Sequence, residues 1–219
     1  MPKENKEQKK ARAKKIFSKL SRMYPEAHCA LDFTNAFELL AATILSAQCT
    51  DARVNIVMKS FRPRFLNPKT LADADLLEIE EVIRTTGFFR QKAKSLKSMA
   101  TDIVEKFGGK VPQTMEELIT LRGVGRKTAN VVLGNAFGIA EGIAVDTHVI
   151  RVANLLKITS HQDPVKIEQD LMQLVPKKEW TMVTHYLISH GRKICIARRP
   201  KCLECGISEL CPSKKLFYP

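Results

Sequence analysis

The sequence is poor in the patterns that mark most other classes of protein. It has no alternating apolar and polar run of the kind that forms a half-buried strand, no heptad pattern and no internal repeat, which argues against a β-sheet protein, a coiled coil or a repeat array. Its longest apolar stretch, around residues 37–47, contains Glu38 and is too short to cross a bilayer. The lysine-rich beginning of the chain also lacks a hydrophobic signal core. We therefore expect an all-α protein that is soluble and cytoplasmic.

Acidic residues are too few to balance the basic ones. The chain of 219 residues has 36 Lys and Arg against 23 Asp and Glu, which gives a formal net charge of +13. Residues 1–22 alone hold nine basic residues and two glutamates, a net charge of +7. This excess favours a polyanionic partner, with nucleic acid as the first candidate, and predicts binding that weakens as salt is added.

What the sequence does contain is one helical pattern after another. Polar caps, apolar faces and Gly or Pro breaks predict helices over about residues 4–24, 36–48, 75–84, 89–107, 114–119, 126–138, 163–176 and 178–190, with further helices that open near Asp51 and Asp146. The Asn67–Pro68 pair predicts a turn. The helix at 36–48 is expected to bury one face, whose members are Phe37, Leu40, Ala41, Ile44 and Leu45.

Two glycines one residue apart begin the helix at 126–138. They lie in the string L-R-G-V-G-R-K-T-A-N at residues 121–130. Glycine allows a sharp turn, and the amides of Gly123, Val124 and Gly125 are expected to point outward beside the positive end of the helix dipole, where they favour a phosphate. Lys127 lies opposite the apolar seam of that helix. The simpler alternative is a helix–loop–helix corner with a solvated lysine.

Three other polar or aromatic positions have both a structural and a functional interpretation. Gln48 either simply ends its helix or is a functional side chain at that helix end. Asp51 opens the next helix. Phe88 and Phe89 at a loop exit are most simply one core residue and one partly covered residue. Asp146, in the string A-V-D-T-H-V, has the position of a helix N-cap, and we regard His148 as structural.

Cysteine is scarce except near the end of the chain. Cys29 and Cys49 stand alone, and the other four cysteines form a C-x6-C-x2-C-x5-C pattern at Cys195, Cys202, Cys205 and Cys211. Four thiols so close together predict a metal centre rather than disulfides. The spacing alone is compatible with zinc and with an iron–sulfur cluster. Structural zinc sites tend to pair two C-x2-C knuckles and only one is present, which weakens the case for zinc without deciding it.

Taken together, these motifs resemble the endonuclease III family of DNA glycosylases. The resemblance rests on residues 121–130, on the string F-E-L-L-A-A-T-I-L-S-A-Q-C-T-D at 37–51, on V-D-T-H at 145–148 and on the four-cysteine loop. It implies a helix-hairpin-helix DNA glycosylase fold. The family would place a helical barrel domain at 29–139, with the hairpin at about 114–138, and an iron–sulfur cluster domain built from 1–28 and 140–219. DNA is expected to lie across the cleft between them.

The resemblance also implies roles for individual residues. Lys127 matches the nucleophile and Asp146 the catalytic aspartate. Gln48 matches the residue that fills the space left by the damaged base, and Phe88 matches a hydrophobic wedge that is commonly leucine. The cysteine loop would hold a [4Fe-4S] cluster that shapes a phosphate-binding loop and takes no part in redox catalysis. The expected DNA contacts are Gln48, Asp51, Phe88, Gly123, Val124, Gly125, Arg126, Arg198, Arg199 and Lys201.

The implied activity is bifunctional base excision. The enzyme would remove oxidised pyrimidines and then cut the abasic strand by β-elimination through a lysine Schiff base, acting as a monomer on damaged or abasic double-stranded DNA of the nucleoid. The chain departs from the family at Arg122, where proline is usual. Two alternatives stay open: an adenine-mismatch glycosylase, against which Lys127 and the absence of a further domain after Cys211 argue, and a non-catalytic module that recognises DNA structure.

Overall fold

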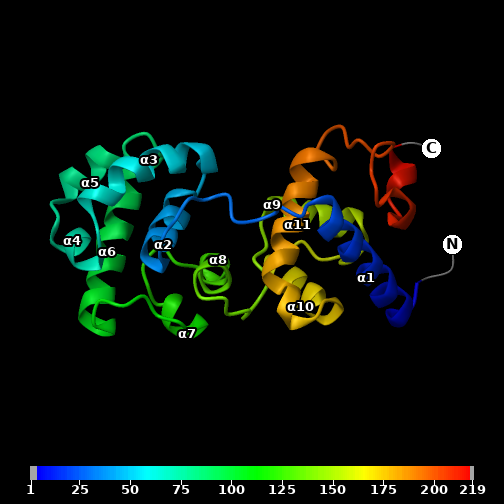
Figure 1. The fold of residues 1–219 in the computed structure, drawn as a ribbon, viewed down its shortest axis with the longest axis horizontal. Helices are drawn as coiled ribbons and strands as arrows, with labels where there is room; N and C mark the ends of the chain where they lie inside the picture. The colour runs from blue at the N-terminus through cyan, green and yellow to red at the C-terminus, as the bar shows by residue number, and fades with distance from the viewer. Residues whose placement is uncertain (1–3, 218–219) are drawn as a thin grey trace. The chain divides into compact units, whose positions relative to one another are not determined.

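The computed structural model describes residues 4–217, and every regular element in that range is helical (Figure 1). The all-α prediction is therefore confirmed. The α-helices are α1 (Lys6–Met23), α2 (Ala36–Leu45), α3 (Asp51–Arg64), α4 (Pro68–Asp73), α5 (Leu76–Ile83), α6 (Phe89–Phe107), α7 (Met115–Leu118), α8 (Arg126–Ala136), α9 (Thr147–Leu155), α10 (Pro164–Leu174) and α11 (Trp180–Lys193). There are also short 3-10 helices: η1 (Lys177–Glu179) precedes α11, and η2 (Ser208–Leu210) and η3 (Lys214–Leu216) follow it. In the part of the chain described, no helix is long and apolar enough to cross a membrane.

The chain folds into two compact units, each with its own hydrophobic core. One unit is the continuous segment Cys29–Glu141, and the other joins Met1–His28 to Gly142–Pro219. The first contains α2 to α8, and the second contains α1 and α9 to α11. Each core is built from buried residues of its own unit.

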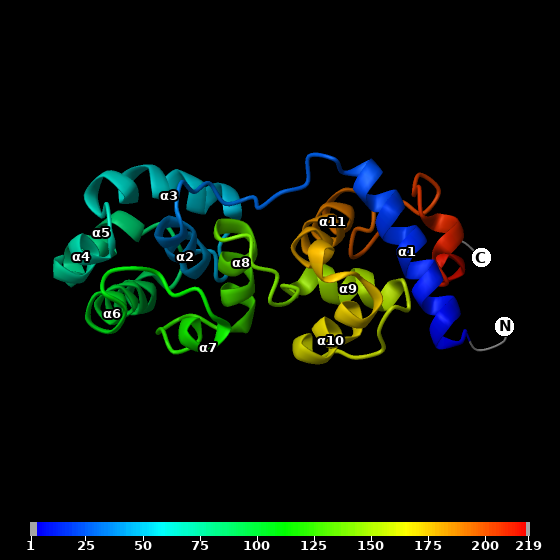
Figure 2. The ribbon, with the colours of Figure 1, turned by 60° about the horizontal axis from the view of Figure 1, so that its bottom comes forward.

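Helix α2 is the centre of the Cys29–Glu141 unit. It packs against α3, α6 and α8, and Figure 2 shows these helices around it. The predicted apolar face was too narrow, because Leu39, Ala42 and Thr43 are buried together with the five residues expected. Three helices packed around α2 leave little of its surface to solvent. Its N-cap is Asn35, whose side chain accepts the Glu38 N–H at 3.0 Å.

The expectation of a simple turn at Asn67–Pro68 was wrong, because these residues begin helix α4. Asn67 accepts the N–H of Thr70 at 3.0 Å, and the Thr70 hydroxyl accepts the N–H of Asn67 at 3.2 Å. Proline at the first helical position loses no hydrogen bond that the helix would use. The pair is therefore a helix start with a reciprocal cap, and α4 packs against α6.

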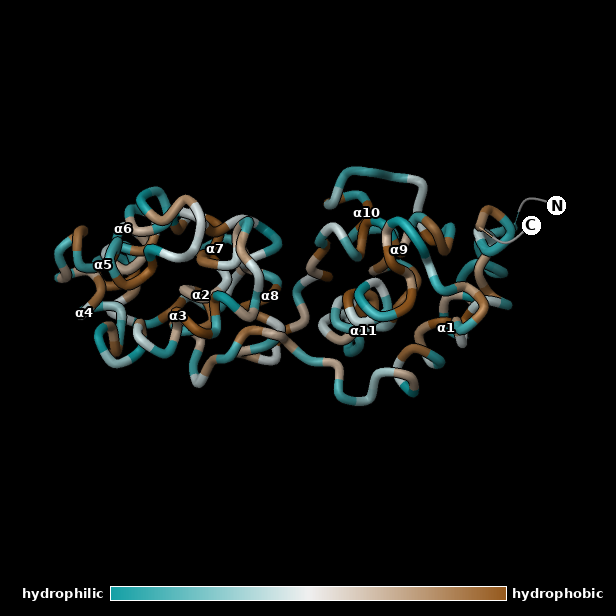
Figure 3. The backbone as a smooth tube through the Cα atoms, turned by 90° about the horizontal axis from the view of Figure 1, so that it is seen from above, coloured by the Kyte–Doolittle hydropathy of each residue, from teal (hydrophilic) through white to brown (hydrophobic). Residues whose placement is uncertain are grey.

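Helix α1 is ordered from Lys6 and has one apolar face. Its residues Ala13, Ile16, Phe17 and Leu20 are buried in the core of the second unit, where α1 packs against α10, α11 and η2. In Figure 3 the tube of α1 alternates between hydrophilic and hydrophobic colours along its length. Arg12 on the polar side donates to the carbonyl oxygens of Leu156 at 2.8 Å and Leu210 at 3.2 Å. The N-terminal helix thereby holds the segment that carries the last cysteines.

Candidate functional site

The glycine turn at residues 121–125 connects α7 to α8 as a tight hairpin. Gly123 has a φ of +83°, and a Cβ atom placed on it would lie 3.1 Å from the Cβ of Ser95. The Val124 N–H donates to the Leu121 carbonyl at 3.1 Å, and the Val124 side chain is only 6% exposed. The prediction that three successive amides point outward is therefore wrong for Val124, whose N–H closes the turn. The structure assigns Val124 to holding the hairpin together.

The two glycines of the hairpin are expected to differ sharply in their tolerance of a side chain. Gly123→Ala places a Cβ in a left-handed backbone and against Ser95, so we expect a loss of about 1–3 kcal/mol of unfolding free energy. Gly125 has a φ of −98° and open space around its Cβ position. Gly125→Ser also supplies a preferred N-cap residue, so it should change stability by less than about 0.5 kcal/mol. Urea unfolding of both variants measures the difference, and equal losses would contradict it.

Helix α8 begins without a side-chain cap. Its N-cap is Gly125, which has no side chain to accept a hydrogen bond, whereas Asn35, Thr114 and Asp146 cap their own helices with side-chain oxygens. The first amides of a helix have no partner within the helix, and they carry the positive end of its dipole. Lys127 lies in this first turn and is exposed. The start of α8 is therefore suited to an anion, with an amine beside it.

Gln48 and Phe88 share an unusual backbone conformation. Gln48 has a φ of 53° and Phe88 a φ of 56°. Helix α2 ends at Leu45, so Gln48 lies in the turn that follows and does not continue the buried face of α2. Both side chains are exposed, and Phe88 is 68% exposed although it is a large hydrophobic residue. Residues held in a left-handed backbone conformation cluster at functional sites, so both positions are candidates for contact with a ligand.

The acidic residues Asp51 and Asp146 both lie at helix starts. Asp51 occupies the first turn of α3, after the N-cap Thr50, and a carboxylate there interacts favourably with the helix dipole. Asp146 is the N-cap of α9, and its Oδ1 accepts the Val149 N–H at 2.8 Å. The capping prediction for Asp146 is confirmed. Asp146 belongs to the second unit and Lys127 to the first.

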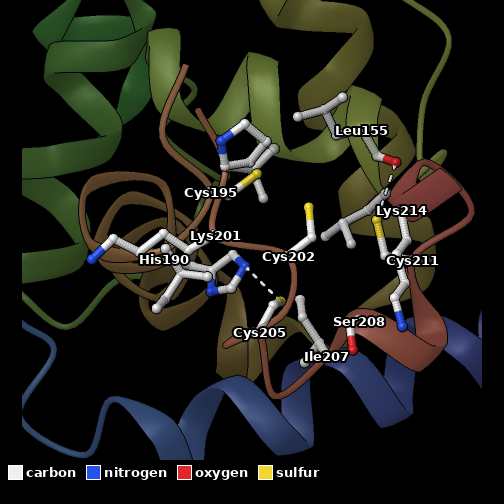
Figure 4. Close-up of a pocket in the computed structure, with 14 residues that line it drawn as sticks. Leu155, His190, Cys195, Lys201, Cys202, Cys205, Ile207, Ser208, Cys211 and Lys214 are labelled. Atoms are coloured by element: carbon white, nitrogen blue, oxygen red, sulfur yellow. Dashed lines mark hydrogen bonds between the residues drawn. The ribbon is translucent and has the colours of Figure 1, made fainter. Parts of the chain in front are cut away.

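The four clustered cysteines line one pocket of the second unit. They are Cys195, Cys202, Cys205 and Cys211, and Figure 4 shows their sulfurs on its walls. Within residues 4–217, no three His, Cys, Asp or Glu side chains converge on a position for a single ion. Four thiols that line one pocket are a donor set that fits an iron–sulfur cluster.

The chemistry of these thiols also fits a metal group. Burial raises the pKa of Cys195 to about 11, and burial likewise raises the pKa of Cys202 and of Cys205. Because burial disfavours the charged thiolate, four thiolates here need positive charge beside them. Bound metal ions supply that charge when they displace the thiol protons. Arg151 fixes the first of these residues, donating from Nη2 to the Cys195 carbonyl at 3.0 Å and to that of Gly191 at 2.9 Å.

A buried pair next to the pocket was not foreseen from the sequence. The Tyr24 hydroxyl lies 2.9 Å from Nδ1 of His190, and Nε2 of His190 lies 3.7 Å from Sγ of Cys205. Burial raises the pKa of Tyr24 to about 12 and lowers that of His190 to about 4. With Cys205 as a thiolate, Tyr24 donates to Nδ1 and the Nε2–H donates to sulfur, which satisfies all three groups. No local motif links these residues, because Tyr24 is the C-cap of α1 and His190 lies in α11.

The segment between the first two cysteines carries exposed positive charge. Arg198, Arg199 and Lys201 are all exposed, and the Lys201 N–H donates to the Ile194 carbonyl at 2.9 Å to close the loop. These side chains extend into solvent from a loop fixed at both ends. The loop therefore presents a cationic surface to any polyanion.

Comparison with known proteins identifies the family in which this hairpin and this cysteine loop occur together. A family model of the HhH-GPD superfamily base excision DNA repair proteins matches residues 41–177, and one of the iron–sulfur binding domain of endonuclease III matches residues 195–211. Endonuclease III of a Synechocystis strain is 52% identical over 205 residues, which cover 94% of each chain. The chain belongs to the endonuclease III family. Endonuclease III of Bacillus subtilis is 45% identical over 194 residues, covering 88% of each chain.

The solved structures agree with this assignment. A structure of a trapped covalent intermediate of endonuclease III with DNA, an estranged-adenine complex, aligns with a TM-score of 0.89 at 41% identity, and covers 94% of this chain and 97% of that chain. The helix-hairpin-helix glycosylase fold is thus confirmed. The cysteine loop is the iron–sulfur domain of endonuclease III, so its cofactor is a [4Fe-4S] cluster and the zinc alternative falls away.

Iron content tests the cofactor directly. We expect protein purified without oxygen to be brown and to contain about four irons and four sulfides per chain. Cys202→Ser should lower the iron content, because it removes one of the four thiols, and Cys29→Ser, outside the loop, should leave it unchanged. A colourless protein that contains zinc would contradict this expectation.

Proposed function

We propose that this endonuclease III relative removes oxidised pyrimidines from duplex DNA and cuts the strand through an imine between Lys127 and the deoxyribose. The protein is a base excision repair DNA glycosylase with AP lyase activity. The observation that carries the residue assignment is the exposed Lys127 in the first turn of the uncapped helix α8. The similar solved structure of a covalent endonuclease III–DNA intermediate supports a nucleophilic side chain.

In the proposed reaction, the unprotonated Lys127 amine attacks C1′ of the damaged nucleotide. The N-glycosidic bond breaks, the base leaves with its electron pair and takes up a proton, and the sugar ring opens to an imine with the lysine. The imine acidifies the C2′ proton. Loss of that proton breaks the C3′–O bond, which cuts the strand on the 3′ side of the lesion, and water then hydrolyses the imine to free the amine. The hairpin and the start of α8 hold the flanking phosphates.

We assign Asp146 the electrostatic and proton-transfer role. A carboxylate stabilises the positive charge that develops on the sugar as the base leaves, and it accepts and returns the protons that the sequence of steps requires. The N-cap bond to Val149 uses Oδ1. The cap fixes the orientation of the carboxylate and leaves Oδ2 for the reaction.

A base in the stack must first be rotated out, and we assign Gln48 and Phe88 to the gap. Extrusion costs a few kcal/mol of stacking and pairing, and inserted side chains offset part of that cost. Phe88 has the exposed apolar ring that a wedge needs, and Gln48 has hydrogen-bonding groups for the estranged partner base. Arg126 and the other expected phosphate contacts position the duplex.

We assign Cys195, Cys202, Cys205 and Cys211 as the cluster ligands. When bound there, an iron–sulfur cluster would be held by these four residues and would cross-link this end of the chain. The cysteine loop presents Arg198, Arg199 and Lys201 to DNA phosphates. We also propose that the enzyme acts as a monomer, because one chain contains both Lys127 and Asp146.

Cleavage of three matched duplexes tests the proposal. We expect nicking of duplexes with thymine glycol or an abasic site, and no excision of adenine opposite guanine. A lysine nucleophile is expected in a glycosylase that also cuts the strand, whereas a glycosylase that only removes adenine does not need one. Adenine release without nicking would support the mismatch alternative. Binding of all three duplexes without cleavage would support a non-catalytic module and overturn the proposal.

A further inference from the structure

Helix α6 contains a buried lysine that no step above uses. Lys92 is 5% exposed, and its Nζ donates to the Leu45 carbonyl at 2.7 Å and to the Thr86 carbonyl at 3.3 Å. No carboxylate of residues 4–217 forms an ion pair with it. A buried ammonium is costly unless its hydrogen bonds are made, so a lysine held by backbone carbonyls alone needs an explanation.

The two carbonyls belong to the two segments that carry Gln48 and Phe88. Leu45 is the last residue of α2, three residues before Gln48, and Thr86 lies two residues before Phe88. The backbone N–H of Lys92 donates to the Phe88 carbonyl at 3.1 Å. One residue thus bonds to both turns at once.

The two turns also lie against each other. A Cβ atom added to Gly87 would be 3.8 Å from the carbonyl oxygen of Gln48, which is ordinary van der Waals distance. The two turns are therefore neighbours in space. Lys92 and both turns belong to the same unit of the chain.

Electrostatics favours a cation at this position. The last carbonyls of α2 carry the negative end of its dipole, and the last turn of α2 contains no basic residue of its own. Lys92 supplies the missing charge from a neighbouring helix. Burial lowers the pKa of Lys92, an effect that the nearby Cys49 opposes.

The turns need such support because their backbones are strained. Within residues 4–217, only three residues other than glycine have a positive φ, and Gln48 and Phe88 are two of them. A left-handed conformation at these side chains persists only where the surroundings hold it. Phe88 is also the N-cap of α6 and gives that helix no side-chain cap. The bonds from Lys92 are the contacts that both turns share.

We propose that Lys92 is a positioning residue that locks the Gln48 and Phe88 turns into one rigid unit, so that both side chains enter the DNA together as the base leaves the stack. This inference rests on the proposed function, which assigns Gln48 and Phe88 to the gap. Loss of the ammonium releases the two turns from each other. Extrusion of a base from a duplex then becomes slower, whereas chemistry at a sugar that is already unstacked does not.

Two substrates separate these steps. Removal of thymine glycol from a duplex requires extrusion, whereas β-elimination at an abasic site in single-stranded DNA does not. We expect Lys92→Met, which keeps the length of the side chain, to lower excision from the duplex by about tenfold or more under single-turnover conditions. Its rate on single-stranded abasic DNA should stay within about threefold of the unsubstituted enzyme. Borohydride trapping on that DNA counts the active molecules in each preparation.

Lys97→Met is the matched control. Lys97 lies on the same helix, and its Nζ also donates to a backbone carbonyl, that of Ala74, which belongs to neither turn. It should not change the ratio of the two rates. If Lys92→Met does not fold, Lys92→Gln takes its place, because its amide keeps an N–H donor without the charge. Equal losses on both substrates, or the same ratio in the Lys92 and Lys97 variants, would overturn the proposal. Failure of the unsubstituted enzyme to cut either substrate would instead overturn the proposed function.

Discussion

Replacement of Lys127 by glutamine is expected to abolish borohydride trapping on abasic DNA and to lower strand cleavage by at least about a thousandfold. Glutamine has no basic amine, so no imine forms and the C2′ proton is not acidified. Lys127 is exposed in the first turn of α8, so its replacement removes no buried packing, and stability should change by less than about 0.5 kcal/mol. Gel separation of the reduced covalent complex measures the trapped fraction, and thermal unfolding checks the fold.

Arg126→Gln is the matched control for this experiment. Arg126 is the neighbouring exposed cation in the same turn, and its loss also lowers the positive charge by one. We expect weaker DNA binding. Trapping should be retained when the enzyme concentration exceeds the raised dissociation constant. An undiminished trapped band in Lys127→Gln would remove Lys127 from its assigned role. Equal loss of trapping in both variants would indicate that charge, and not the amine, is what the turn supplies.

The helix starts show how far local sequence determines this fold. Asn35, Thr50, Asp75, Thr114 and Asp146 all cap the helices that their positions predict, because a cap depends only on a side chain and the amides two or three residues later. The Asn67–Pro68 pair misled for the opposite reason. Its letters favour a turn, and the reciprocal bond with Thr70 makes it a helix.

The parts that local sequence did not predict depend on contacts between distant segments. Eight of the ten residues of α2 are buried because three other helices pack against it, and the periodicity of its own sequence does not show those neighbours. Val124 has its N–H turned into the hairpin, although the two glycines suggested an outward row of amides. No local sequence motif predicts the role of Lys92, because its partner Leu45 is 47 residues away in the chain.

The candidate site was predictable to the extent that its residues lie in contiguous strings. The hairpin, the Gln48 turn and the cysteine loop are each short enough for a resemblance to identify. The residues that orient them come from distant segments: Tyr24 is the C-cap of α1 and His190 lies in α11, and only the fold brings the two together. Groups that position a site are therefore harder to find in a sequence than the groups that they position.

Replacement of Asp146 by asparagine is the second change with a large expected effect, since we expect turnover to fall by about a hundredfold or more while the fold is retained. Asparagine caps helices as well as aspartate does, so the bond to the Val149 N–H and the start of α9 should survive. What is lost is the negative charge that stabilises the developing sugar cation. Single-turnover excision, DNA affinity and melting temperature should be measured together.

Asp146→Ala separates the two roles of this residue. Alanine removes the cap as well as the charge, which should cost about 1 kcal/mol of stability beyond any change in Asp146→Asn. A catalytic carboxylate predicts that both variants lose turnover to the same degree and that only the alanine variant loses stability. A capping role alone predicts that Asp146→Asn is fully active, because the cap is preserved. Activity and stability that fall together in both variants would mean that the cap holds the whole unit, and the catalytic assignment would then lose its support.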